Sequence, residues 1–126
     1  MLVQWWRKLK ELRFSQRRQR WYLKVSDESI RIEYMGKEIA EIKSRDVNEV
    51  VAFKRDLFTE DLICVQITFG HGNHERTEEI HEEMRGFDEV MAHLARQLPG
   101  FDRDWRMKVV KPAFEAIWTV LYRRSA

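Results

Sequence analysis

Charged residues between two apolar runs are the first candidates for chemistry in this chain of 126 residues. Lys54, Arg55 and Asp56 close one run, and Glu60 and Asp61 open the next. As a cluster, these side chains would grip a ligand or a metal ion. As turn residues, they would be solvated, with a lysine or arginine pairing an acid across a hairpin. The pattern favours the polar tip of a hairpin.

The same turn carries two apolar residues, Leu57 and Phe58. Apolar side chains are unusual at a solvated hairpin tip, so we expect Leu57 and Phe58 to fold under the body of the domain or to form a contact surface. We therefore count Lys54, Arg55, Asp56 and Phe58 as candidate binding residues.

Histidines and one cysteine are the other residues with chemical potential. His74 and His81 are seven positions apart, so a regular strand places them on opposite faces, and His71 adds no further ligand of good geometry. Cys64 falls in the strand best fitted to burial, where thiols are usually inert. Neither a glycine-rich phosphate loop nor a nucleophile elbow is present. We expect no cofactor and no enzymatic activity. The enzyme alternative is a metal-dependent one that uses the hairpin acids and the histidines.

The N-terminal segment is strongly basic. Residues 1–24 hold eight of the 23 basic residues and one of the 21 acidic ones, which leaves an acidic body. In MLVQWWRKLKELRF, apolar residues recur at helical spacing, so we predict an amphipathic helix, followed by the polar linker SQRRQR. The candidate binding residues here are aromatic or basic: Trp5, Trp6, Arg7, Lys8, Arg17, Arg18 and Arg20.

Such a helix has several uses. It would dock on its own body, hold two copies together as a homodimer, or lie on an anionic membrane surface, where each basic residue adds about 1 kcal/mol. Arginines beside Trp21 and Tyr22 would also suit single-stranded nucleic acid. The acidic body disfavours that partner.

From Trp21 the period changes to two, which predicts about six antiparallel strands. The period returns to 3.6 at Phe87, and Pro99-Gly100 ends the helix predicted over 87–98. The conformation of residues 101–126 stays open, although residues 112–118 fit one or two helical turns and residues 119–122 fit an extended segment. The predicted strands cover residues 21–25, 29–34, 39–42, 47–53, 62–69 and 74–82.

Composition favours a folded, cytoplasmic protein. Hydrophobic residues make up 44% and charged residues 35%, which suits a globular domain. With one cysteine, no internal disulfide forms. No secretory signal or spanning segment is visible, so we expect a cytoplasmic protein that would sit at the inner membrane face if the basic helix binds lipid. The predicted division is a basic helix and linker over 1–20 and one α+β domain over 21–126.

The order of strands and helix over about 21–98 resembles the pleckstrin-homology-like barrel. The runs AFKRDLFTEDLIC, EEMRGFDEV, LPGF and PAFEAIWTVLYRR resemble a group of small uncharacterised bacterial proteins built on the same plan. This resemblance implies a bacterial cytosolic origin and carries over no catalytic residue. Some pleckstrin-like domains hold phosphoinositide head groups with basic residues between their first two strands. Here that turn, Ser26-Asp27-Glu28, is acidic.

These observations predict an α+β fold: an antiparallel, strongly twisted sheet or partly closed barrel, a packing helix after the strands and an N-terminal amphipathic helix. The predicted function is non-catalytic binding through protein contacts, of an immunity-like kind. The alternatives are binding to an anionic membrane surface through the N-terminal helix, and the metal-dependent enzyme.

Overall fold

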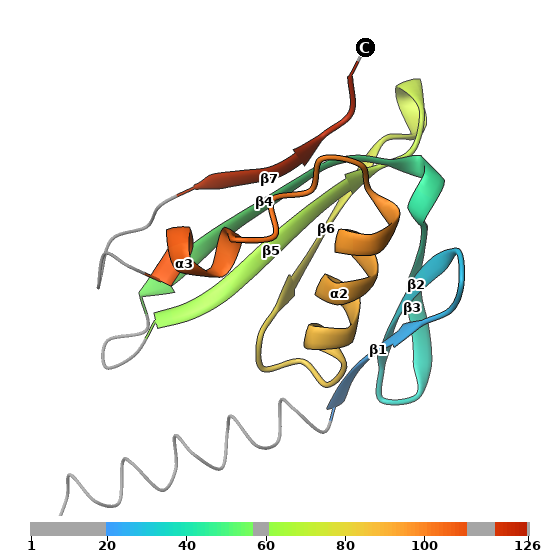
Figure 1. Cartoon of the computed structure of the whole chain (residues 1–126). Coiled ribbons are helices and arrows are strands. Elements are labelled where there is room, and N and C mark those ends of the chain that lie inside the picture. The colour runs from blue at the N-terminus through green and yellow to red at the C-terminus, as the bar shows by residue number, and fades with distance from the viewer. Residues whose placement is uncertain (1–19, 57–60, 111–117, 126) are drawn as a thin grey trace, which may run out of the picture.

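The computed structural model describes residues 20–56, 61–110 and 118–125. This part of the chain is α+β and consists of two antiparallel sheets with helices against them (Figure 1). The sheets do not close into a barrel. The predicted N-terminal helix, with Trp5, Trp6, Arg7, Lys8, Arg17 and Arg18, lies outside the described residues, as does Phe58.

The first sheet has three strands in the order β1-β2-β3. They are β1 (Trp21–Val25), β2 (Ser29–Tyr34) and β3 (Lys37–Lys43). Between β2 and β3, Met35 and Gly36 have φ values of 51° and 80°. Two successive positive φ values fit the two-residue hairpin turn whose twist matches that of the flanking strands.

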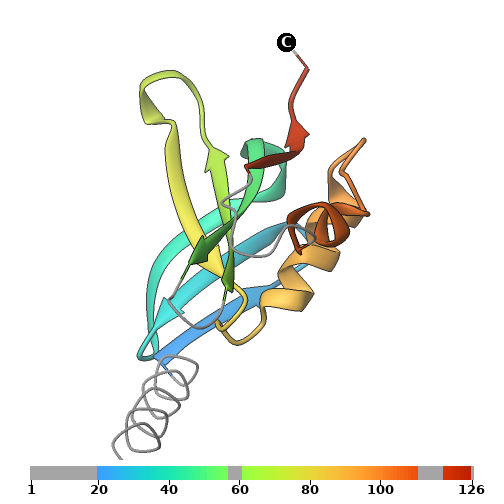
Figure 2. The same cartoon turned by 90° about the vertical axis from the view of Figure 1, so that its left-hand side faces the viewer.

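The second sheet has four strands in the order β6-β5-β4-β7. They are β4 (Val47–Asp56), β5 (Asp61–Phe69), β6 (Arg76–His81) and β7 (Thr119–Arg123). The short turn η1 (Ser44–Asp46) leads from β3 directly into β4, and η2 (Gly72–His74) connects β5 with β6. Figure 2 shows that the strands of the two sheets run in different directions.

Helices cover the inner side of the sheets. α2 (Phe87–Gln97) packs on β1, and α3 (Trp105–Val110) lies over β4 and β7 (Figure 1). Gly86 immediately precedes α2 and has a φ of 93°, and a Cβ there would lie 2.1 Å from the backbone oxygen of Leu23. Only glycine allows this approach of α2 to β1.

The core lies between the inner faces of the two sheets and the apolar side of α2. Trp105 packs edge-on against Phe87 with ring centroids 6.4 Å apart, which joins α3 to the same core. The fully buried residues of this core include Leu23, Ile30, Ile42, Val50, Ile67, Ile80 and Leu94.

The predicted strands and helix occur with small shifts of their ends, and the helix ends one residue early, at Gln97. One strand was not among the six: β7 follows both helices in the chain and pairs with β4, far away in sequence. The prediction of a single sheet or partly closed barrel was too coarse, because η1 turns the chain from one sheet into a second one.

Candidate functional site

The predicted charge cluster at the β4–β5 hairpin is divided between the two faces of the sheet. Asp56 is paired in register with Asp61, and Lys54 with Ile63. Because side chains alternate along a strand, Lys54 points to the inner face and Arg55 to the outer face. The structure therefore does not bring Lys54 and Arg55 together in one site.

Lys54 is a buried cation with only 4% of its surface exposed. Its Nζ lies 3.4 Å from Oδ2 of Asp61 and donates to the carbonyl of Val110, 3.5 Å away at the end of α3. The prediction that a basic residue pairs with an acid across the hairpin is confirmed for Lys54. The expectation that this residue is solvated was wrong, because α3 covers the inner face of β4.

Arg55 lies on the outer face, where its Nη2 is 2.6 Å from Oε1 of Glu79 on β6. The hydrogen bond and the negative charge of Glu79 raise the pKa of Arg55. Its guanidinium carbon is also 5.3 Å from the ring centroid of Phe53. Arg55 therefore connects the polar β6 side of the outer face with an apolar region around Phe53.

That apolar region contains a pair of stacked aromatic rings at the surface. Trp118 stacks on Phe53 with ring centroids 4.1 Å apart and planes 15° from parallel. Phe53 is 3% exposed, whereas Trp118 is 58% and Val120 44% exposed. We call Phe53, Arg55, Trp118 and Val120 the aromatic patch.

The aromatic patch lies over buried residues. Phe53, Leu62 and Cys64 form a second buried cluster, separate from the main core. The sequence pattern predicted one buried face for β5, but in this segment both faces are buried. Burial raises the pKa of the Cys64 thiol to about 11. Cys64 is therefore protonated at neutral pH and contributes packing, in keeping with the inert thiol that the sequence predicted.

The histidines lie at opposite ends of β6 and belong to local polar contacts. Nε2 of His71 is 3.1 Å from Oδ1 of Asp46, and Nδ1 of His81 accepts from the backbone N–H of Glu83. His74 ends η2 and is exposed. Within residues 20–56, 61–110 and 118–125, no three histidine, cysteine or acidic side chains are grouped to hold a metal ion.

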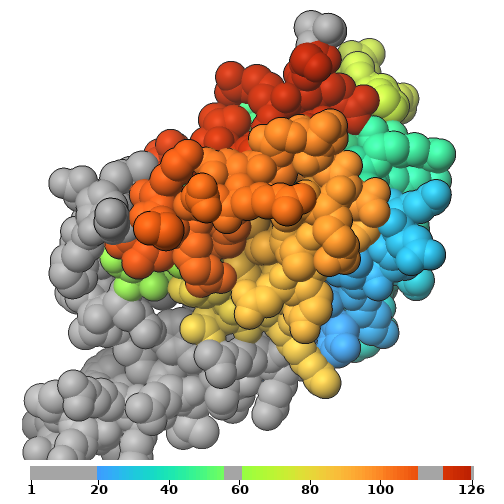
Figure 3. All heavy atoms as spheres, viewed as in Figure 1, coloured from blue at the N-terminus to red at the C-terminus, as the bar shows by residue number. Residues whose placement is uncertain are grey.

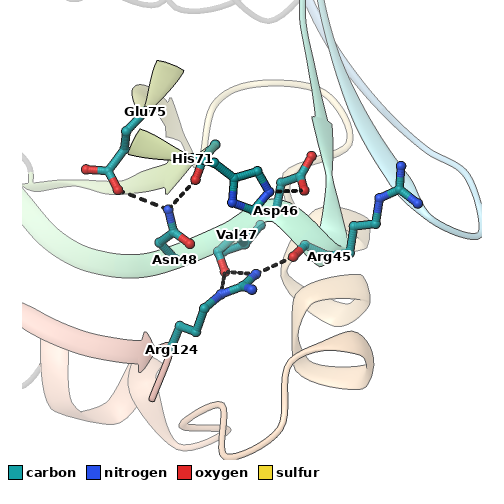
Figure 4. A network of polar contacts seen from close by, with 8 residues as sticks. Arg45, Asp46, Val47, Asn48, His71, Glu75 and Arg124 are labelled. Atoms are coloured by element: carbon teal, nitrogen blue, oxygen red, sulfur yellow. Dashed lines mark hydrogen bonds and ion pairs between the residues drawn. The ribbon is translucent and has the colours of Figure 1, made fainter. Parts of the chain in front are cut away.

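A polar network joins the β3–β4 corner to the end of β7 (Figure 4). Arg124 donates to the carbonyl of Val47 at 3.0 Å and to that of Arg45. Asn48 donates to the carbonyl of Gly70 at 2.7 Å and to the Glu75 carboxylate at 3.0 Å. These bonds to main-chain carbonyls hold the strand ends in place, which indicates a structural role.

Sequence reasoning missed one buried polar pair. Oγ of Ser44 lies 2.6 Å from Nε2 of His93 on α2, and both side chains are buried. Burial lowers the pKa of His93, and the nearby Arg96 lowers it further. The helical period could have placed His93 on the apolar side of α2, but only the fold shows its partner.

Of the candidate binding residues predicted in the N-terminal segment, the structure describes Arg20 alone. Arg20 is exposed, and its carbonyl accepts a hydrogen bond from the backbone N–H of Met35 at 2.7 Å, which ties Arg20 to the β2–β3 turn. No helix in the described ranges is both long and apolar enough to cross a membrane.

Comparison with known proteins assigns no family to this chain. No family model, no curated protein and no solved structure matches the chain.

Proposed function

We propose that this chain is a non-catalytic binding protein that recognises a protein partner through the aromatic patch. The observation that carries the proposal is the exposed Trp118 stacked on the buried Phe53, with Val120 and Arg55 beside it. Tryptophan and arginine are the residues most enriched at binding hot spots.

The geometry suits a hot spot for two reasons. Phe53 is held in the second buried cluster, so Trp118 rests on a fixed support and loses little freedom when a partner covers it. Val120 faces the same side as this stack, because it is paired in register with Val51, which shares a face of β4 with Phe53. The patch lies on a sheet face, and such a surface fits the surface of another protein better than a small molecule.

A partner of the immunity kind, in which a small protein covers another protein's surface, agrees with this patch and is part of the proposal. The pleckstrin-homology-like plan also stays a proposal. Antiparallel strands followed by α2 support it, whereas β7, which follows both helices and pairs with β4, is an addition to that plan.

The two alternatives have less support. Membrane binding depends on Trp5, Trp6, Arg7 and Lys8, all outside the described residues. The metal-dependent enzyme needs the hairpin acids and the histidines in one place, and in the described ranges Asp61 lies with Lys54 while His71 lies with Asp46.

Site-specific photocrosslinking tests the proposal. A photoreactive amino acid is placed at Val120 or at Ile39, an aliphatic residue of β3 with a similar exposure of 47%. In cells that naturally produce the chain, we expect a discrete protein adduct from position 120 and none from position 39. Trp118→Ala should abolish the adduct while the variant stays folded, since a ring stack is worth about 0.5–1.5 kcal/mol. Equal adducts from both positions, or none, would show that the patch is not the contact surface.

A further inference from the structure

A hollow of about 520 Å³ lies between β1 and the start of α2, and no residue of the aromatic patch lines it. Figure 3 shows β1 in blue against the beginning of α2 in gold on this face of the molecule. Three cations line the hollow: Lys24 from β1, Arg31 from β2 and Arg85 from the segment before α2. We propose that this hollow binds a phosphate group, free or carried on a lipid headgroup.

Tyr22 organises the cations. The Arg85 guanidinium carbon is 4.8 Å and Lys24 Nζ is 5.2 Å from the centroid of its ring. Gly86 allows the close approach of the chain to β1, and the backbone N–H of Leu23 donates to the carbonyl of Arg85 at 2.7 Å. The Arg85 side chain is therefore held beside β1.

Among the residues that line the hollow, three cations outnumber one acid, and two further acids lie beside these cations. Lys24 stands directly opposite Arg31 in the register of β1 and β2, and like charges at such positions repel each other. Glu33 lies 3.2 Å from Lys24 and neutralises it. Glu89 also lines the hollow, and Glu41 stands opposite Arg31 on β3.

Neither arginine of the hollow forms an ion pair within the described ranges, although acids are near. A phosphate group between Arg31 and Arg85 would supply an anionic partner to both arginines and accept several charge-assisted hydrogen bonds. Arginine suits this role because its planar guanidinium meets phosphate oxygens in pairs. The cations come from strands and from the segment before α2, and the acidic β1–β2 turn contributes none of them.

Titration of the full chain with inorganic phosphate, at constant ionic strength, tests the proposal. Amide signals of Tyr22, Arg85 and Glu89 are followed by NMR. We expect saturable shifts confined to this hollow, and affinity about tenfold or more lower in the double variant Arg31→Gln/Arg85→Gln. A matched variant, Lys37→Gln/Arg103→Gln, removes the same charge elsewhere and should bind like the unaltered chain. Unsaturated shifts, or equal losses in both double variants, would overturn the proposal.

Vesicles separate the two sources of phosphate. Phosphatidylcholine vesicles with and without phosphatidic acid are sedimented with the unaltered chain and both double variants. Binding to the acidic vesicles that is lost only in Arg31→Gln/Arg85→Gln would assign the phosphate to a lipid, and phosphate binding without vesicle binding to a soluble compound. Vesicle binding that is equal in all three proteins, without saturable phosphate shifts, would overturn the proposal and place membrane contact in residues 1–20. Tighter binding of a single-stranded oligonucleotide, lost in the same variant, would overturn it in favour of nucleic acid.

Discussion

Substitution of Gly86 by alanine should separate β1 from α2. The added Cβ would meet the Leu23 backbone oxygen at 2.1 Å and its carbonyl carbon at 3.0 Å, and backbone atoms cannot rotate away as a side chain can. The φ of 93° adds a cost of about 1–2 kcal/mol for a residue with a Cβ. Loss of the hydrogen bond from Leu23 to Arg85 costs about 1 kcal/mol, and overpacking costs about 1–3 kcal/mol.

We therefore expect Gly86→Ala to lower the free energy of unfolding by about 3–6 kcal/mol, or Tm by roughly 10–20 °C. Gly36→Ala is the matched control, because Gly36 has a similar φ of 80° but nothing within 4 Å of its Cβ position. Its cost should stay near 1 kcal/mol, since alanine also restricts the unfolded chain.

Urea denaturation measures both variants, and hydrogen exchange at the Leu23 amide gives a local readout. That amide should exchange faster in Gly86→Ala alone. If the two glycine variants are equally stable, and the Leu23 amide is equally protected in both, the close contact between α2 and β1 is not what requires glycine at position 86.

Two further predictions concern buried polar groups. Lys54→Met should lower the free energy of unfolding by about 1–3 kcal/mol, which is less than for a fully buried pair because the Asp61 side chain is 20% exposed. The double variant Lys54→Met/Asp61→Leu should recover part of this loss in urea denaturation. Additive effects of the two substitutions would contradict the pairing. Burial gives folded His93 a lowered pKa, so the unfolded chain binds more protons and the free energy of unfolding should fall as pH drops below about 6.5. His93→Gln, which can still hydrogen-bond Ser44, should flatten this fall. Burial raises the pKa of Glu82, and this shift changes the free energy of unfolding with pH in the opposite direction. Because Glu82 is present in both the unaltered chain and His93→Gln, the difference between their pH profiles isolates His93. Identical profiles would contradict the prediction.

The aromatic patch and the hollow beside β1 belong to different sheets. Trp118 and Val120 lie at β7 of the four-stranded sheet, whereas Lys24 and Arg31 lie in the three-stranded sheet. Variants of one surface should therefore leave the other unchanged, since distant sites are usually independent. This independence allows the two proposals to be tested separately in the same protein.

The local repeat of apolar residues was enough to predict most of the fold. Alternation with period two predicted β1 to β6, and the spacing of Phe87, Val90, Met91 and Leu94 predicted α2, because each pattern reflects one buried face. β7 was left open because five residues of mixed character fit several conformations until β4 supplies a partner.

The candidate site depended on tertiary structure. Adjacent positions in a strand face opposite sides, so the sequence could place Lys54 and Arg55 on different faces of the sheet. It could not show that α3 covers one of these faces while solvent covers the other. The stack of Trp118 on Phe53 and the meeting of Arg85 with Tyr22 join residues far apart in the chain. Sequence alone determined which residues share a face of an element. The packing of distant elements decided which faces are covered, because burial depends on what lies opposite.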